Sequence, residues 1–200
     1  MIGLNSLSRI LEVVENCEKC KLYKYRDKCV FAEGKDDAKI MLIGLSPGKE
    51  ENSTGRLFIG PSGVFLNKLL QLAKLKRESL YITNIIKCHA PTHSIGKEEI
   101  STCSVYLDKQ IELVKPQIII PLGSIATRYT LEKYNLPKKG ISEIHGQLFH
   151  VSVGDLFNPS RGIKIIPMFH PAAALRTPVL LELIKKDWQR LGFEEKINKN

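Results

Sequence analysis

The cysteines give the first indication of chemistry. Two of the five form a C-x2-C pair at Cys17 and Cys20, whereas Cys88 and Cys103 stand alone with 14 residues between them. An odd number does not suit a disulfide framework, and cytosolic thiols stay reduced, so the grouping favours metal binding or catalysis. One pair plus two remote cysteines suits an iron–sulfur cluster somewhat better than a zinc ribbon, which carries two such pairs, but zinc stays open. The fifth, Cys29, is interpreted as a small buried hydrophobic residue.

Polar and aromatic residues elsewhere could act on a heterocyclic ring. The amide of Asn84 offers a donor beside an acceptor, which matches the edge of uracil, although a loop-capping role is also open. His170, which begins the run His-Pro-Ala-Ala-Ala-Leu-Arg, could stabilise a developing anion or bond only to backbone. Phe58 could stack on a flat ring or cover the core. Glu51, next to Glu50, could orient a water molecule or be solvated.

Alternating strands and helices are predicted to position these residues. Short apolar runs predict strands at Lys39–Ile43, Leu80–Ile86, Gln117–Leu122, Gln147–Val153 and Lys164–Phe169. Helices are expected at about 6–16, 62–74 (capped by Ser62), 98–114, 124–134 and 178–191. The alternation predicts a single three-layer α/β domain over residues 1–192 with a mostly parallel central sheet. The tail at 193–200 is expected to fray.

The carboxyl ends of the predicted strands select the candidate site. Ligands of open parallel sheets bind beyond these ends, and the polar candidate residues are predicted to lie there. A loop of nearly 20 residues, 44–63, follows the first strand, and structureless loops of that length are usually functional. Asn84 lies near the end of the second strand and His170 follows the last.

Composition and charge narrow the class of protein. The chain of 200 residues is 43% hydrophobic and 26% charged, with a net charge of +9. The positive excess favours a polyanion such as nucleic acid, although a basic surface that only aids solubility is equally open. No apolar run approaches the ~20 residues of a membrane span, and the N-terminus lacks a signal pattern. We therefore expect a cytoplasmic protein without a membrane partner.

The combined motifs resemble the family 4 uracil-DNA glycosylases, the iron–sulfur branch of their superfamily. The resemblance covers about residues 13–191. It rests on the C-x2-C pair, on the strand KIMLIG with the Pro-Gly loop after it, on G-x-x-F-x-G-x-x-G from Gly55 to Gly63, on YITNIIKC ending at Cys88, and on His170-Pro171-Ala172.

This resemblance implies an enzyme that flips uracil out of DNA and hydrolyses its N-glycosidic bond, initiating base excision repair; we expect it to be a monomer. Phe58 would stack on the base, Asn84 would read its Watson–Crick edge, and His170 would bond the leaving uracil. The remaining implied residues fall into three groups: [4Fe–4S] ligands Cys17, Cys20, Cys88 and Cys103; pocket residues Leu45, Ser46, Pro47 and Gly48; and DNA contacts Ser62, Lys87, Ala173, Leu175 and Arg176.

One motif departs from the family pattern. The family usually reads Gly-Glu-Ala-Pro-Gly, whereas this chain reads Gly-Leu-Ser-Pro-Gly from Gly44 to Gly48. Because Leu45 cannot act on water, we expect carbonyls of the Ser46–Pro47 loop or Glu51 to orient the attacking water. No lysine is marked as a Schiff-base nucleophile, so the glycosylase is expected to be monofunctional. A catalytically silent relative, a zinc-stabilised nucleic-acid-binding module, and a glycosylase that also takes hypoxanthine or xanthine are the alternatives.

Overall fold

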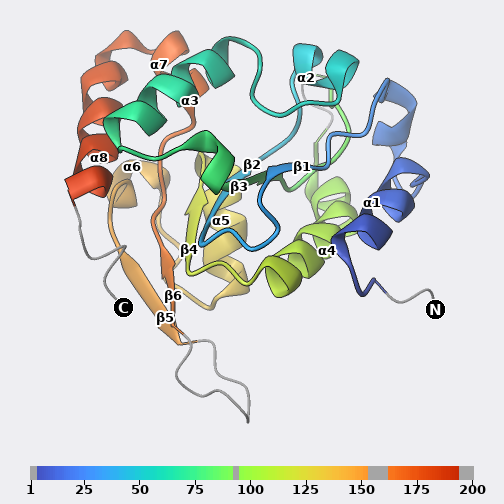
Figure 1. The fold of residues 1–200 in the computed structure, drawn as a ribbon. Coiled ribbons are helices and arrows are strands. Elements are labelled where there is room, and N and C mark those ends of the chain that lie inside the picture. Colours follow the sequence, from blue (N-terminus) through green and yellow to red (C-terminus); the bar gives the residue numbers. More distant parts are fainter. Residues whose placement is uncertain (1–3, 92–94, 153–161, 194–200) are drawn as a thin grey trace.

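A six-stranded sheet forms the centre of the computed structural model (Figure 1). The structure describes residues 4–91, 95–152 and 162–193. The strands lie in the order β1-β3-β2-β4-β6-β5, and their bounds are β1 Ala32–Gly34, β2 Ile40–Gly44, β3 Tyr81–Asn84, β4 Ile118–Pro121, β5 Phe149–Ser152 and β6 Gly162–Ile165. The four inner strands are parallel, and the edge strands β1 and β5 pair antiparallel. The mostly parallel sheet predicted from the sequence is confirmed.

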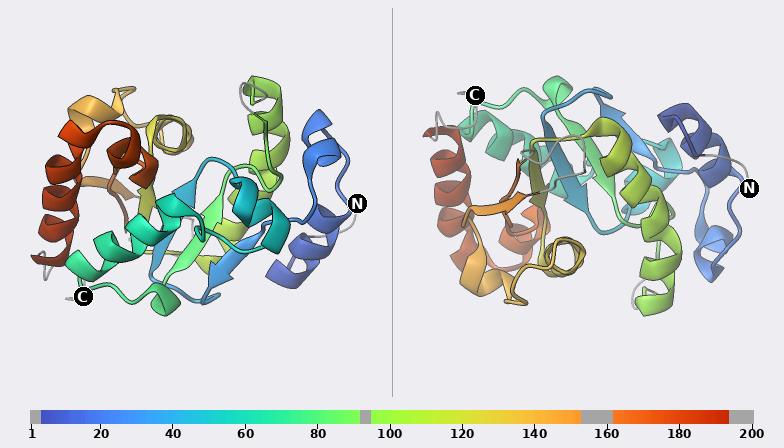
Figure 2. Two further views of the ribbon diagram at one scale, coloured as in Figure 1. Left: turned by 90° about the horizontal axis from the view of Figure 1, so that it is seen from above. Right: turned by 90° about the horizontal axis from the view of Figure 1, so that it is seen from below.

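Helices cover both faces of this sheet, as the two views of Figure 2 show. On one face lie α3 Pro61–Leu72, α7 Pro171–Arg176 and α8 Leu181–Phe193. On the other lie α1 Leu7–Glu15, α4 Lys97–Val114 and α5 Ser124–Lys133. The shorter elements are η1 Lys21–Tyr25, α2 Lys49–Thr54, η2 Arg77–Ser79, α6 Ile141–Ile144 and η3 Pro178–Leu180.

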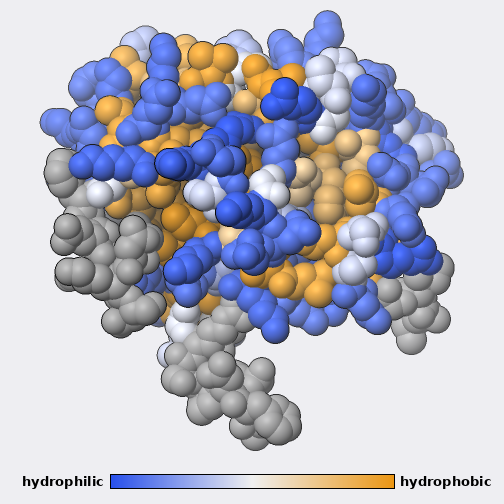
Figure 3. All heavy atoms as spheres, viewed as in Figure 1, coloured by the Kyte–Doolittle hydropathy of each residue, from blue (hydrophilic) through white to orange (hydrophobic). Residues whose placement is uncertain are grey.

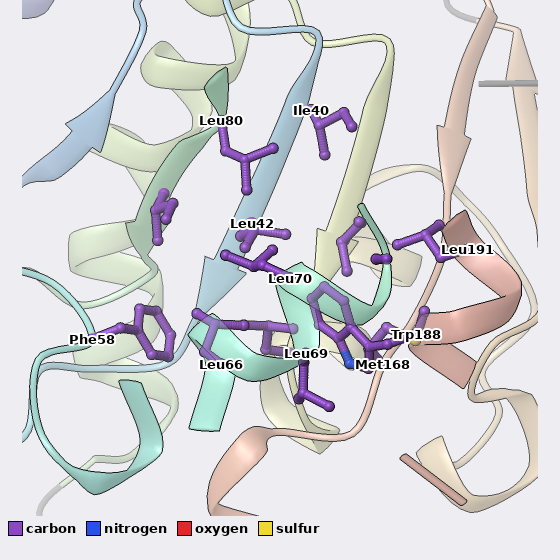
Figure 4. Close-up of a cluster of buried hydrophobic side chains, with 14 of the residues drawn as sticks. Ile40, Leu42, Phe58, Leu66, Leu69, Leu70, Leu80, Met168, Trp188 and Leu191 are labelled. Atoms are coloured by element: carbon purple, nitrogen blue, oxygen red, sulfur yellow. The ribbon is translucent and has the colours of Figure 1, made fainter. Parts of the chain in front are cut away.

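Each face of the sheet has its own hydrophobic core. Side chains of a strand alternate between the two faces, so Leu42 of β2 packs in the first core, whereas Met41 and Ile43 pack in the second. The apolar face predicted for the helix after the long loop is buried in the first core: Leu66, Leu69, Leu70 and Ala73. Figure 4 shows Phe58 at one end of this core and Trp188 near the other.

Several predicted boundaries differ from the observed ones. The long loop contains α2, whose polar sequence KEENST has no apolar stripe and therefore gave no helical signal. Helix α3 begins at Pro61 with Gly60 as its N-cap, so Ser62 lies in the first turn and does not cap the helix. The helix expected from Pro178 starts as the 3-10 turn η3, and α8 begins three residues later.

Some observed elements have no counterpart among the predicted ones. The edge strand β1 has three residues, and α6 and α7 have four and six, which is too short for a periodic signal. Almost all of the turn-rich segment at 154–162, and the tail from residue 194, lie outside the described residues.

The described surface carries many hydrophilic side chains with apolar patches between them, as the face in Figure 3 shows. None of the described helices combines the length and apolar character needed to cross a membrane.

Candidate active site

A small cavity lies where the carboxyl ends of β2 and β3 approach the segment after β6. It has a volume of about 130 Å³ and is lined by Ser46, Pro47, Gly48, Glu51, Phe58, Ser62, Asn84 and His170. All eight are candidate site residues from the sequence, and the fold brings them together from four separate segments. Three larger hollows, of about 350, 420 and 460 Å³, are lined by other residues. The chemistry of the lining, and not the volume, therefore distinguishes the candidate site.

Asn84 ends β3 and lies directly beside Gly44, its register partner at the end of β2. Its side chain is buried. A Cβ atom on Gly44 would lie 2.2 Å from the Asn84 Oδ1 atom and 3.1 Å from the Phe58 Cζ atom. Glycine at this position therefore leaves the space in which the amide of Asn84 and the ring of Phe58 meet the cavity.

Lys87 supports this strand end from inside the protein. The prediction that Lys87 contacts DNA is wrong, because its side chain is fully buried. Its Nζ atom donates to Asn84 O at 2.6 Å, to Thr83 Oγ1 at 2.7 Å and to Gln110 Oε1 at 2.6 Å. These acceptors match the three donors of an ammonium group, although burial lowers the pKa of Lys87 to about 8.

His170 lines the cavity with a neutral imidazole ring. Its Nδ1 atom accepts a hydrogen bond from the Ala172 N–H at 3.1 Å, so the neutral ring carries its proton on Nε2. Burial lowers the pKa of His170 to about 4, and the charge of Arg176 acts in the same direction, against the opposite influence of Glu51. The ring centroid lies 5.9 Å from that of Phe58. At neutral pH, His170 therefore offers a hydrogen-bond donor without a positive charge.

Glu51 is buried, so the solvated alternative does not apply to it. Its Oε1 atom accepts hydrogen bonds from the N–H groups of Ile59 at 3.0 Å and Gly60 at 3.1 Å. Its Oε2 atom would lie 2.4 Å from a Cβ atom on Gly48, at the cavity wall. One carboxylate oxygen thus fixes the turn after Phe58, while the other faces the Gly48 side.

Leu45 is the one predicted pocket residue that is not part of the cavity lining. It packs against the second hydrophobic core. Ile43 lies two residues earlier in the extended chain and belongs to the same core, so the side chains of Leu45 and Ile43 point to the same face of the sheet.

The backbone carbonyl of Pro47, which lies in the same loop, contacts Nδ1 of His89 at 3.1 Å.

Three of the expected DNA contacts lie on the short helix α7, beside His170. Leu175 is 51% exposed. Arg176 is exposed and Ala173 is partly buried. Ser62 lies apart from them, in the first turn of α3 and in the cavity wall.

The four cysteines predicted as ligands gather against the second core. Cys88 and Cys103 are buried in this core, and Cys17 and Cys20 are partly buried against it. Burial raises the pKa values of the Cys88 and Cys103 thiols, and negative charge on Cys20 would raise both further. Cys29 is also partly buried against this core. Within the described ranges, no three His, Cys, Asp or Glu side chains are close enough to hold a metal ion.

Hydrogen-bond donors surround these sulfur atoms. Tyr106 Oη donates to Cys17 Sγ at 3.3 Å, and Arg26 Nη1 lies 3.5 Å from Cys88 Sγ. The same guanidinium donates to the backbone carbonyls of Val14, Glu15 and Cys17. Burial raises the pKa of the Cys103 thiol to about 11. Positive charge at the site is therefore needed to hold this sulfur as a thiolate.

Known proteins of one superfamily are similar to this chain over most of its length. Residues 31–193 match the model of the uracil DNA glycosylase superfamily. A type-4 uracil-DNA glycosylase of Saccharolobus solfataricus is 36% identical over 192 residues, which cover 94% of this chain and 86% of the relative. One of Archaeoglobus fulgidus is 32% identical over 94% of this chain and 93% of the relative. A type-5 uracil-DNA glycosylase of Pyrobaculum aerophilum is 26% identical over 80% of this chain and 72% of the relative.

Proposed function

This chain belongs to the uracil-DNA glycosylase superfamily and excises uracil from DNA, and we propose that the cavity between Phe58, Asn84 and His170 holds the flipped base. The observation that carries the proposal is the meeting of an aromatic ring, a buried amide and a neutral imidazole around one small cavity. A base cannot reach such a cavity while it is stacked in duplex DNA, so it must be extruded first.

His170 and Asn84 are proposed to stabilise the leaving group. Cleavage of the N-glycosidic bond leaves negative charge on uracil and positive charge on the sugar. The Nε2–H of His170 would donate to O2 of the base, and the Asn84 amide would donate to O4 and accept from N3–H. A preorganised donor of this kind contributes about 3 kcal/mol to the transition state.

Glu51 is proposed to orient the attacking water. Its Oε1 atom is committed to two backbone amides, which fixes the direction of Oε2. The Pro47 carbonyl is the weaker candidate, because it already contacts His89. Leu45 takes no part in this step, since it packs on the other side of the strand end.

DNA is proposed to lie across the α7 side of the cavity. The net charge of +9 favours contact with phosphates, whose strength falls as salt rises. Leu175 is exposed beside His170, where an apolar side chain can occupy the space that a flipped base leaves. Ser62 and Arg176 would contact the backbone.

The cysteine residues fit a [4Fe–4S] cluster, which we propose is held by Cys17, Cys20, Cys88 and Cys103. In such a cluster each thiolate binds a different iron, so the four sulfur atoms stand farther apart than the ligands of one ion. When bound, the cluster would crosslink the N-terminal segment to the β3–α4 region and would supply no reaction step. Hydrogen bonds from Tyr106 and Arg26 are typical of the surroundings of cluster thiolates.

Replacing Cys103 with serine tests the ligand set. We expect the anaerobically purified variant to lose the visible absorption and iron content of the wild type, and its first 30 residues to become sensitive to limited proteolysis. Cys29→Ser is the matched control, because this thiol is also partly buried at the site, and it should change neither property. Full absorption in Cys103→Ser would contradict the assignment, and zinc in place of iron would favour a zinc-stabilised module.

The proposed function is tested with labelled oligonucleotides carrying uracil, hypoxanthine, xanthine or thymine, in single strands and in mismatched duplexes. Release of uracil without strand cleavage is the expected result for a monofunctional glycosylase. Equal release of hypoxanthine would indicate a broader range of bases, and no release would indicate a silent DNA-binding relative. The monomeric state and the domain boundary at residue 192 stay predictions.

A further inference from the structure

The backbone at Phe58 is held in a conformation that a bulky residue seldom adopts. Its φ angle is 48°, in the left-handed region. The first turn of α3 lies directly against it, because a Cβ atom on Gly63 would sit 1.7 Å from the Phe58 carbonyl oxygen. Strained backbone of this kind persists only where the surroundings hold it, so the residues that hold it bear on where the aromatic ring lies.

A carboxylate and a guanidinium hold the residue before Phe58 by both of its backbone polar groups. Glu33 Oε1 accepts from the Leu57 N–H at 2.9 Å, and Arg77 Nη2 donates to the Leu57 carbonyl at 2.6 Å. The same nitrogen donates to Glu33 Oε2 at 2.9 Å. Since the Leu57 carbonyl and the Phe58 nitrogen belong to one peptide plane, Arg77 fixes the plane from which Phe58 departs.

This pair is anchored to the rest of the fold. Glu33 lies on β1 and Arg77 on η2, and Arg77 Nη1 also donates to Asn67 Oδ1 of α3 at 3.1 Å. Both side chains are about three-quarters buried, being 24% exposed. Burial would raise the pKa of Glu33, but hydrogen bonds from Arg77 and the Leu57 amide outweigh it, so the pKa is lowered and the carboxylate stays ionised.

We propose that Glu33 and Arg77 are positioning residues, which hold the Leu57–Phe58 peptide so that the Phe58 ring is preformed as the platform for the flipped base. Neither side chain belongs to the cavity lining, so each acts through the backbone of Leu57 and not by touching the base. The inference rests on the proposed function, because it needs Phe58 to contact the substrate. It adds the requirement that the ring be oriented before DNA arrives.

A double-mutant cycle with Phe58 tests the proposal. Arg77→Met should lower the single-turnover rate of uracil release by about 10- to 100-fold, the scale of a misplacement of about 1 Å. In a Phe58→Ala background, Arg77→Met should change the rate by no more than about twofold, because the platform is already absent. Arg9→Met, which removes an exposed arginine from its pair with Glu12 on α1, is the control and should leave the rate unchanged.

Conservative variants separate positioning from stability. Glu33→Gln keeps an oxygen that can accept from the Leu57 N–H and should retain most of the rate, whereas Glu33→Ala should behave like Arg77→Met. The inference would be overturned if the rate effects of Arg77→Met and Phe58→Ala were additive, or if Arg77→Met had a normal rate. Uracil release by the wild type would still support the proposed function in either case. Thermal unfolding identifies a variant that has lost its fold, in which case Glu33→Ala, which removes the acceptor of the Leu57 N–H, takes its place in the cycle. Absence of uracil release from the wild type would instead refute the proposed function.

Discussion

Replacing His170 with alanine is expected to lower the single-turnover rate of uracil release by about 100- to 1,000-fold, the usual cost of removing one preorganised donor to a developing anion. The ring is placed for this role by the Ala172 N–H, which occupies Nδ1 and leaves the proton on Nε2. Alanine removes this donor and also the acceptor that caps the Ala172 N–H at the start of α7, so thermal unfolding of the variant is measured beside the rate.

The dependence of the rate on pH checks the same assignment. Because the pKa of His170 is lowered to about 4, the ring stays neutral where an ordinary histidine titrates, near pH 6.5. The wild-type rate should therefore show no inflection near pH 6.5 and should fall only as the pH approaches 4. Protonation there puts a hydrogen on Nδ1, opposite the Ala172 N–H, and the ring must move.

Controls for this prediction come from one exposed histidine and one buried carboxylate. His150→Ala, an exposed residue of β5, should leave the rate unchanged. Glu51→Gln should lower the rate less than His170→Ala, because the proposed mechanism assigns the larger share of catalysis to stabilisation of the anion. A nearly normal rate in His170→Ala together with an inactive Glu51→Gln would reverse this division and make Glu51 the principal catalytic group.

The parallel sheet explains why much of the site could be predicted from the sequence. Strong apolar runs mark the inner strands, and parallel strands present their carboxyl ends at one edge. Asn84, His170 and the Ser46–Gly48 loop therefore had to converge, and the cavity lining contains all of them.

Errors arose where the face of a strand, or a distant partner, decides the position of a side chain. Leu45 lies two residues after Ile43 and shares its face, a consequence of strand periodicity that its neighbours in the motif conceal. Lys87 is a charged residue for which the surface is the ordinary expectation. It is buried because Gln110, 23 residues away in the sequence, supplies an acceptor. The role of Glu33 could not be predicted from its neighbours in the sequence either, because the residue it binds, Leu57, lies 24 residues farther along the chain.

The second large effect is expected from Asn84→Asp, which keeps the size of the side chain and removes its amide donor. Asn84 is buried, and its backbone carbonyl accepts a hydrogen bond from Lys87 at 2.6 Å, which fixes the strand end that carries the side chain. An ionised aspartate would oppose O4 of uracil with a second acceptor. Sites built to hydrogen-bond one pattern reject another strongly, and we expect uracil release to fall by at least about 100-fold.

Binding to undamaged DNA separates recognition of the base from contact with the backbone. Affinity for an undamaged duplex should stay within about threefold of the wild type, because phosphate contacts dominate that free energy. Asn135→Asp, at an exposed position after α5, introduces the same charge and should change neither the rate of uracil release nor the affinity for DNA.

A protonated aspartate at position 84 presents a donor beside an acceptor in the order that cytosine requires, and burial favours the protonated form. Slow release of cytosine that rises as the pH falls is therefore expected from Asn84→Asp alone, and unchanged uracil kinetics would remove Asn84 from the pocket.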